Sequence, residues 1–210
     1  MTTVAPARLT ADERRQSILD AATVVFGERG YYGATTDAIA AAAGISQAYV
    51  VRMFGSKEEL FIAAGGRAAQ RVVDSFRAAI DTFTPETTLE ERKVALGAAY
   101  SNLVVDRGLL LTLMHFLALG HDPVLGPLAR DYYLRVFRMV RDEARIPAAE
   151  ATAFFARGML INVLVALRLP DVAGADDAAQ DLLACSFEGK EDMLIALCGA
   201  QPRLGPARRG

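Results

Sequence analysis

The chain has 210 residues and a mass of 22.5 kDa, enough for one large domain or two small ones around a hydrophobic core. Hydrophobic residues make up 52% and charged residues 23%, which excludes a disordered or fibrous protein. The formal net charge is −2, so any nucleic-acid surface has to be local. Residues 1–15 carry charges and no apolar stretch, so we expect no secretory signal and a cytoplasmic protein.

Membrane-spanning segments and metal sites are not expected either. The longest apolar run, residues 108–120, is shorter than the ~20 residues that span a bilayer. The spacing of Cys185 and Cys198 suits neither a disulfide scaffold nor a paired-cysteine metal site. His115 and His121 do not have the spacing of a helical metal pair. We therefore expect no metal and no other cofactor.

Helix signals recur along the chain. Capping boxes, in which a Ser or Thr precedes a Glu by three residues, occur at residues 10–13, 56–59 and 88–91. Prolines and glycines separate the segments, and no stretch alternates polar and apolar residues for long enough to form a strand. This pattern predicts an all-α fold of about nine helices. Residues 201–210 contain two Pro, two Gly and three Arg, and we expect a disordered tail there.

Residues 35–54 contain the features that a helix-turn-helix motif requires. Ala40 is small, as it has to be where a second helix crosses close above the first. Gly44 can adopt the positive φ of the tight turn, and Ser46 can cap the next helix through its hydroxyl. The small core of the motif is expected to comprise Ile39, Ile45, Val50 and Met53. Short helices joined by glycine also occur in helical bundles, so the motif alone leaves DNA binding and simple packing both open.

A wider pattern surrounds this motif. The positions that carry it are Ile18-Leu19-Asp20-Ala21-Ala22, Phe26-Gly27-Glu28-Arg29-Gly30-Tyr31, Thr35-Thr36, Ile39-Ala40, Ala43-Gly44-Ile45-Ser46 and Phe54-Gly55-Ser56-Lys57-Glu58-Glu59-Leu60. With these positions, residues 15–60 resemble the DNA-binding domain of the TetR (tetracycline repressor-like) family of transcriptional regulators. The resemblance implies a three-helix helix-turn-helix domain over residues 1–56. A larger helical domain for ligand binding and dimerisation is expected to follow over residues 57–200.

One departure from the family pattern lies in the recognition helix. The family commonly carries Gly-Thr-Leu-Tyr there, with the tyrosine bound to a phosphate. This chain has Ala48-Tyr49-Val50-Val51, so Val51 stands where that tyrosine is expected. Tyr49, two positions earlier, can contact DNA by another geometry. The operator sequence therefore does not follow from the resemblance.

Eight residues are candidates for DNA contacts: Thr35, Thr36, Ser46, Gln47, Ala48, Tyr49, Arg52 and Lys57. The threonine pair opens the first helix of the motif, where hydroxyls and free amides can hold a phosphate. In the recognition helix, Gln47 can read adenine and Ala48 can touch a thymine methyl. Tyr49 and Arg52 can reach a base edge or a phosphate, and Lys57 resembles the family's phosphate-contacting lysine. Each residue has an alternative interpretation as a solvated side chain or an ordinary cap.

The local charge indicates that DNA binding needs two copies of the chain. Residues 1–57 contain six basic and five acidic side chains, a net charge of only +1. A symmetric dimer that holds two such domains ~34–36 Å apart fits successive major grooves of a near-palindromic operator. Residues 147–169 and 176–199 are expected to form helices that are apolar on more than one face. They can lie inside a monomeric bundle or, as the resemblance implies, form a four-helix dimer interface.

The middle of the chain offers candidates for a ligand cavity. Large apolar groups alternate with a few hydrogen-bonding groups, as in small-molecule pockets. The candidates are Tyr100, Met114, His115, Phe116, Tyr133, Phe137, Phe155, Met159 and Asn162. Aromatic residues at helical spacing are equally typical of an ordinary core. Asn162, surrounded by apolar residues, is the strongest polar candidate because a buried amide needs hydrogen-bond partners.

The residues and the resemblance together predict a homodimeric DNA-binding transcriptional regulator. We expect a repressor that a small, largely apolar effector releases from its double-stranded DNA operator. The alternative is an all-helical enzyme or adaptor that acts on a small apolar molecule without binding DNA. The sequence has no glycine-rich phosphate loop and no nucleophile elbow, so we expect no enzymatic activity. Gly65 and Gly66, in the helix after residue 56, indicate either a hinge or a site of close packing.

Overall fold

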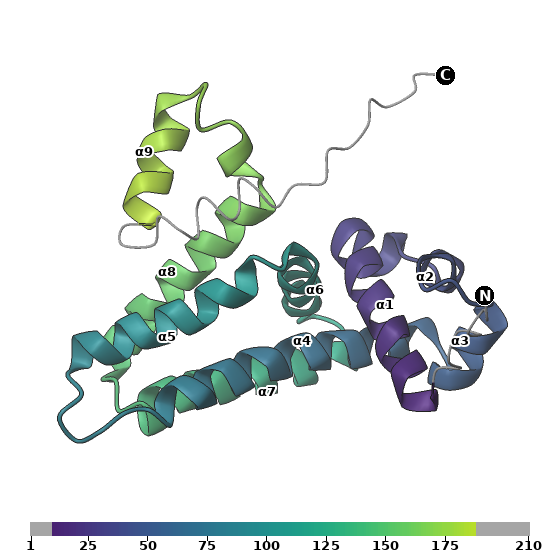
Figure 1. The fold of residues 1–210 in the computed structure, drawn as a ribbon, viewed down its shortest axis with the longest axis horizontal. Coiled ribbons are helices and arrows are strands. Elements are labelled where there is room, and N and C mark those ends of the chain that lie inside the picture. Colours follow the sequence, from purple (N-terminus) through teal and green to yellow (C-terminus); the bar gives the residue numbers. More distant parts are fainter. Residues whose placement is uncertain (1–9, 188–210) are drawn as a thin grey trace, which may run out of the picture. The chain divides into compact units, whose positions relative to one another are not determined.

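The computed structural model describes residues 10–187, and every regular element in this range is helical (Figure 1). The elements are α1 (Ala11–Gly33), α2 (Thr36–Ala42), α3 (Gln47–Phe54), α4 (Lys57–Ile80), α5 (Leu89–Val104), α6 (Arg107–Ala118), α7 (Leu125–Arg138), the π-helical segment η1 (Met139–Glu143), α8 (Ala148–Ala166), the 3-10 turn η2 (Leu169–Asp171) and α9 (Asp177–Ser186). The prediction of an all-α fold is therefore confirmed for this part of the chain. The expected end of the last helix near residue 199 and the expected tail over residues 201–210 lie outside the described residues.

The described chain forms two compact units. The first combines the residues up to Gln70 with Gly108–Arg130, and the second combines Arg71–Arg107 with the residues from Asp131 onwards. The first unit therefore contains α1–α3, the first part of α4 and nearly all of α6. Our expected boundary after residue 56 did not place α6 with the N-terminal helices, because nothing in its sequence indicates which helix it packs on.

Side-chain caps begin several helices where the sequence predicts them. The amide of Glu13 donates to the Thr10 hydroxyl at 3.2 Å, and the Thr10 amide donates to the Glu13 carboxylate at 2.7 Å. The same reciprocal pair joins Thr88 and Glu91 at the start of α5. Ser56 accepts the amide of the residue three positions later at 3.0 Å. These bonds satisfy amides that have no partner within their own helix.

Aromatic side chains hold the first unit together. The rings of Phe26 on α1 and Phe61 on α4 pack edge to face, with 4.8 Å between their centroids. Phe116 on α6 approaches Phe61 at 5.9 Å. All three side chains are buried, and burial of a phenylalanine contributes ~1.5–3 kcal/mol to stability. The core of this unit therefore depends on α6 as well as on the N-terminal helices.

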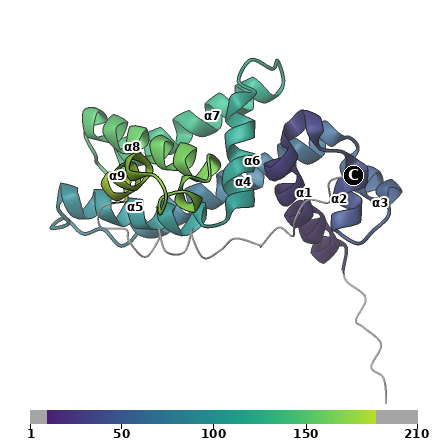
Figure 2. The ribbon, with the colours of Figure 1, turned by 90° about the horizontal axis from the view of Figure 1, so that it is seen from above.

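α6 also lies close against α1 (Figure 2). The Thr112 hydroxyl donates to the backbone carbonyl of Thr23 at 2.8 Å. A Cβ on Gly27 would lie 2.9 Å from the carbonyl oxygen of Gly108, so this approach requires glycine. α1 is kinked at Gly30, whose φ of 67° is outside the helical region.

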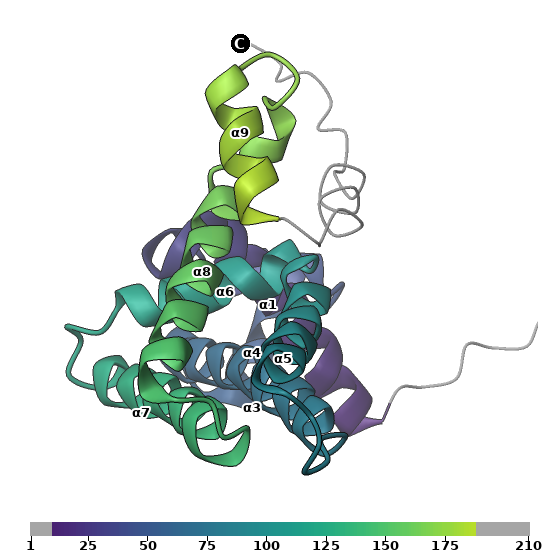
Figure 3. The same cartoon turned by 90° about the vertical axis from the view of Figure 1, so that its left-hand side faces the viewer.

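The second unit is built around α8. α8 contacts α5, and after the turn η2 the chain returns so that α9 packs against α8 (Figure 3). Its buried side chains are mostly leucine, isoleucine, valine and phenylalanine at helical spacing, among them Phe76, Leu96, Leu103, Val136, Ile161, Leu164, Leu183 and Phe187. The unit is thus a helical bundle with an apolar interior.

α8 is unusually apolar for its length. It has 19 residues and a mean hydropathy of 1.4 over its most apolar window, so by length and composition alone it could cross a membrane. α8 does not stand out in the sequence as an uninterrupted apolar run, because it contains Glu150 and Arg157. Core helices of helical bundles reach the same hydropathy.

Candidate nucleic-acid interface and candidate ligand site

The α2–turn–α3 segment has the geometry of a helix-turn-helix motif. Ala40 is buried at the crossing, with 2% of its surface exposed. Gly44 has φ +66°, and the amide of Ile45 donates to the Ala40 carbonyl at 3.0 Å to close the turn. Ser46 accepts the Tyr49 amide at 3.3 Å and thereby caps α3. The roles predicted for Ala40, Gly44 and Ser46 in the motif are confirmed.

α3 has one buried face and one exposed face. Val50 and Phe54 are buried, at 1% and 9% exposure, and fix the helix on the unit. The outward face lies at helical spacing and comprises Gln47, Ala48, Val51 and Arg52. Val51 is 37% exposed, so the residue that replaces the family's tyrosine lies on this outward face.

The two helices of the motif are joined by polar side chains. Gln47 donates its amide to the Thr36 hydroxyl at 3.2 Å. Thr35 caps α2 by accepting the Ala38 amide at 3.1 Å. These bonds hold the first turn of α3 against the start of α2, and the amide oxygen of Gln47 makes no protein contact among the described residues. The structure therefore gives Thr35 a capping role and leaves the side-chain oxygen of Gln47 available as a hydrogen-bond acceptor.

Two arginines flank the ring of Tyr49. The Arg52 guanidinium lies 4.7 Å from the ring centroid and the Arg14 guanidinium lies 5.6 Å from it. Arg15 stacks similarly on Phe54 at 4.4 Å. Such cation–π contacts each contribute ~0.5–1 kcal/mol at exposed sites and keep the charges near the ring. The Tyr49 phenol is thus held in a locally positive environment.

Arg14 and Arg15 were not among the predicted DNA-contact residues. They begin α1, 32 positions or more before the recognition helix, so helical periodicity gives no sign that they reach it. The available signal in the sequence was that these two arginines are adjacent in the first turns of a helix, in a chain whose formal net charge is −2.

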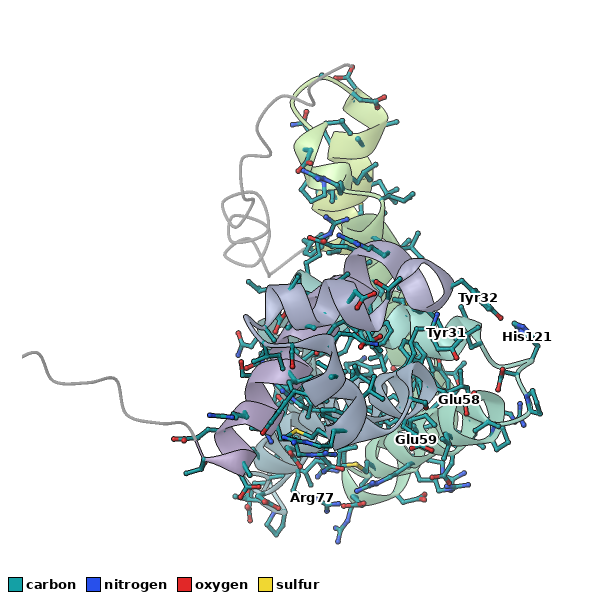
Figure 4. The ribbon with its side chains drawn as sticks, turned by 90° about the vertical axis from the view of Figure 1, so that its right-hand side faces the viewer. Tyr31, Tyr32, Glu58, Glu59, Arg77 and His121 are labelled. Carbon is teal, nitrogen blue, oxygen red and sulfur yellow. The ribbon has the colours of Figure 1, made fainter. Side chains whose placement is uncertain are left out.

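Lys57 occupies a structural position at the start of α4. Its amine donates to the carbonyls of Tyr31 at 3.1 Å and Ala34 at 3.3 Å, and it lies 4.7 Å from the Tyr31 ring centroid. Figure 4 shows Tyr31 and Glu58 on the same side of the unit. Burial raises the pKa of the Tyr31 phenol, and the negative charges of Glu58 and Asp122 raise it further. Lys57 therefore ties α4 to the end of α1 and has one N–H left for another acceptor.

Six of the nine candidate ligand residues lie in the second unit. The Tyr100 hydroxyl donates to the Asn162 side-chain oxygen at 2.7 Å, and the Asn162 amide lies 3.7 Å from the Met159 sulfur. Asn162 is only 3% exposed, so this pairing meets the requirement of a buried amide. Burial raises the pKa of Tyr100 to about 12, which keeps its hydroxyl protonated.

Aromatic rings surround Phe155 on α8. Tyr133 and Phe137, both on α7, meet its ring edge to face at 5.3 Å and 5.4 Å. Phe154 approaches it at 6.2 Å. Tyr133 and Phe137 are only partly buried, and burial raises the pKa of Tyr133. This aromatic cluster has the composition of a small-molecule site, with the Tyr100–Asn162 pair as its polar element.

The other three candidates, Met114, His115 and Phe116, belong to the first unit. Phe116 packs on Phe61 and Gly65 in the core of that unit. The His115 ring lies against Gly30, where a Cβ would be 3.4 Å from it. The described contacts of His115 and Phe116 therefore lie within the first unit. The sequence grouped the three residues with the aromatic cluster because large apolar and hydrogen-bonding side chains occur together there.

Gly65 and Gly66 differ sharply in their surroundings. A Cβ on Gly65 would lie 2.7 Å from the Phe116 ring, whereas nothing lies within 4 Å of the corresponding position on Gly66. α4 runs through both residues without interruption. Of the two interpretations offered by the sequence, close packing accounts for Gly65.

Comparisons with known proteins identify sequence relatives of the N-terminal region. Residues 18–64 match the family described as "Bacterial regulatory proteins, tetR family". The chain is 43% identical over 77 residues to the HTH-type transcriptional activator FasR of Mycolicibacterium smegmatis, a match that covers 37% of this chain and 35% of FasR. It is 40% identical over 60 residues to the HTH-type transcriptional repressor AcnR of Corynebacterium glutamicum, covering 29% and 32%. The matched segment spans about a third of the length of each relative.

The similarity in fold extends further along the chain. A TetR-like transcriptional regulator from Rhodococcus sp. RHA1 superimposes with a TM-score of 0.62 at 24% identity, covering 87% of this chain and 98% of that one. The shared fold therefore includes helices beyond the helix-turn-helix motif, although the sequences have diverged there.

Proposed function

The chain belongs to the TetR family of bacterial regulatory proteins, and we propose that it is a homodimeric transcriptional repressor of the cytoplasm. It binds a near-palindromic operator and leaves it when a small, largely apolar effector binds. The observation that carries this proposal is the outward face of α3, which offers an amide, two apolar side chains and a guanidinium beside the arginine-flanked ring of Tyr49.

The outward face of α3 has the chemistry of major-groove readout. The Gln47 amide oxygen and its remaining N–H can form hydrogen bonds with adenine. The Ala48 and Val51 methyls can contact thymine methyls, and Arg52 can bind guanine or a phosphate. Val51 cannot make the phosphate contact of the family's tyrosine. Tyr49 and Arg14 supply that contact instead, because the Arg14 guanidinium on α1 lies 5.6 Å from the ring centroid of Tyr49 on α3.

A second copy of the chain covers an apolar stripe on α8. Leu160, Val163 and Leu167 follow the spacing of one helix face and are 40%, 41% and 67% exposed, whereas the neighbouring Leu164 is 2% exposed. Leu182 on α9 is 42% exposed as well. Large apolar side chains exposed as a continuous stripe are typical of protein interfaces. Pairing two such stripes gives the symmetric dimer that a near-palindromic operator requires.

The effector site is the aromatic cluster of the second unit. Tyr133, Phe137 and Phe155 provide apolar surface, and the Tyr100–Asn162 pair can exchange its hydrogen bond for one to a polar group of the effector. By linkage, the factor by which effector weakens operator binding equals the factor by which operator weakens effector binding. FasR is named an activator and AcnR a repressor, so these relatives do not decide between activation and repression. That the chain represses transcription is therefore a separate part of the proposal.

Footprinting and sedimentation test these statements together. We expect the protein to protect one near-palindromic segment in the DNA upstream of its own coding region. Val163→Glu is expected to abolish both the dimer and the footprint, since it places a charge in the apolar stripe. Val94→Glu, at a 61% exposed valine of α5, is the matched control and is expected to leave both intact. A Val163→Glu variant that still sediments as a dimer would place the interface elsewhere.

A further inference from the structure

A cavity of about 200 Å³ lies at the C-terminal end of α4, within the second unit. One wall is apolar and is formed by Ile80, Phe83 and Pro85. The lining also includes Arg92 from the first turn of α5, and residues 143–145 at and after the end of η1. Its volume is below the ~300–1,000 Å³ of pockets for drug-sized ligands, so it suits a small molecule. The candidate effector residues do not line it.

The charges around this cavity do not balance. Its lining includes Arg92, Glu143 and Arg145. Both carboxylate oxygens of Glu143 accept hydrogen bonds from the Arg77 guanidinium, which neutralises that charge. Neither Arg92 nor Arg145 has an acidic partner among the residues that the structure describes. The cavity is therefore left with excess positive charge.

Arg92 is half-buried, and its guanidinium has unused hydrogen-bonding capacity. One terminal nitrogen donates to the Ala144 carbonyl at 3.3 Å. Its Nε–H is fully buried and has no acceptor within residues 10–187. Buried donors without an acceptor are uncommon in folded proteins and call for an explanation. An anion in the adjoining cavity supplies the compensating charge to the same guanidinium and an acceptor for its terminal N–H groups.

Arg145 reaches the cavity through an unusual backbone conformation. Its φ is 56°, in the left-handed region that residues other than glycine adopt only occasionally. The turn follows directly after η1, whose last residue, Glu143, also lines the cavity. Strained residues of this kind cluster at ligand sites. The turn adds a second arginine to the lining that includes Arg92.

We propose that this cavity binds a small organic carboxylate. The guanidinium groups of Arg92 and Arg145 pair with the carboxylate, since the planar guanidinium matches its two oxygens. Ile80, Phe83 and Pro85 contact the short apolar part of the molecule. This apolar wall favours an organic acid over inorganic phosphate, which has no apolar part. Its lining shares no residue with the proposed effector cluster or with the candidate DNA-contact residues.

Calorimetric titration of the purified full chain with butyrate tests the proposal without DNA. We expect one saturable site per chain for butyrate and none for butyramide, which has the same shape but no charge. Arg145→Asn is expected to weaken binding by roughly tenfold or more, because a charge-assisted pair is lost. Asn is chosen since it tolerates the left-handed backbone of this position. Arg92→Gln should have a similar effect.

Arg138→Gln is the matched control, an exposed arginine just before η1 that does not line the cavity. Its butyrate affinity is expected to stay within about twofold of the wild type. Butyrate binding that is equal in wild type, Arg145→Asn and Arg92→Gln would overturn the proposal. Binding of inorganic phosphate without binding of butyrate would overturn the assignment to organic acids. Neither outcome bears on operator binding, so this inference and the proposed function fail independently.

Discussion

The hydroxyl of Thr112 donates to the backbone carbonyl of Thr23 at 2.8 Å, across 89 positions of the chain. Thr112 is fully buried, and the contact fixes α6 on α1, the helix whose first turns carry Arg14. Because α1 also packs on α2, a displacement of α6 reaches the helix-turn-helix motif through direct contacts. This packing gives the first unit a physical route by which movement of α6 can alter DNA binding.

Thr112→Val tests the importance of this contact. Valine has nearly the same shape but no hydroxyl, so we expect the free energy of unfolding to fall by about 0.5–1.5 kcal/mol. Urea denaturation measures this change. Thr112→Ser keeps the donor and is the control for the hydroxyl, although it loses a methyl group. Equal stability of Thr112→Val and the wild type would show that the bond contributes nothing net.

Alanine substitutions at the two adjacent glycines of α4 are expected to have opposite effects on stability. Gly65→Ala forces the buried ring of Phe116 to move and is expected to destabilise the chain by about 1–3 kcal/mol. Gly66→Ala meets open space and raises helix propensity, so it should stabilise by up to about 1 kcal/mol. Thermal and urea unfolding of the two variants compare them directly. Stabilisation by both substitutions would contradict the packing of Gly65 on Phe116.

Arg14 is expected to contact the operator backbone beside Tyr49. Arg14→Gln should weaken operator binding and reduce the slope of log affinity against log salt by about 1, because one phosphate contact is lost. Arg138→Gln removes the same charge from the second unit and should leave that slope unchanged. Electrophoretic mobility shifts over a salt series give both slopes. Identical slopes for the two variants would remove Arg14 from the interface.

The buried phenol of Tyr100 predicts a loss of stability at high pH. Burial raises the pKa of Tyr100 from its ordinary value of 10.0 to about 12, so the folded chain favours the neutral form. Its contribution is fully present below pH 10 and is lost as the pH rises toward 12, by about 2–3 kcal/mol. Tyr100→Phe has no proton to lose and should show a shallower decline of stability across this window.

Tyr32→Phe is the control for that experiment, since Tyr32 is 74% exposed. Figure 4 shows its side chain pointing away from the unit. Removal of the Tyr32 hydroxyl should leave the loss of stability at high pH unchanged. At pH 8, Tyr100→Phe should also be less stable than the wild type by about 1–3 kcal/mol, because Asn162 loses its partner in a buried position. An unchanged alkaline decline in Tyr100→Phe would assign the effect to other groups.

Local features were predicted well from the sequence. The caps at Thr10, Thr88 and Ser46 and the positive φ of Gly44 each depend on residues within four positions, so short patterns are enough to identify them. The helix-turn-helix motif follows from the same patterns. The family match over residues 18–64 includes this motif, because the segment carries the residues that are most specific to the family.

Contacts between distant residues were not predictable in the same way. The stacking of Arg14 on Tyr49 and the lodging of Phe116 against Gly65 depend on how helices cross, which hydrophobic periodicity does not specify. Periodicity likewise could not separate the residues of α6 from those of the aromatic cluster around Phe155. The stripe on α8 was partly foreseen, but the burial of Leu164 next to exposed Val163 required the three-dimensional packing.

Fluorescence anisotropy with DNA from upstream of the protein's own coding region measures whether the chain binds a specific operator. We expect tight, salt-sensitive binding to one near-palindromic fragment and far weaker binding to random DNA. Tyr49→Ala should lose this specific binding while the dimer persists. Equal and weak binding of the wild-type protein to every upstream and random fragment would contradict the account.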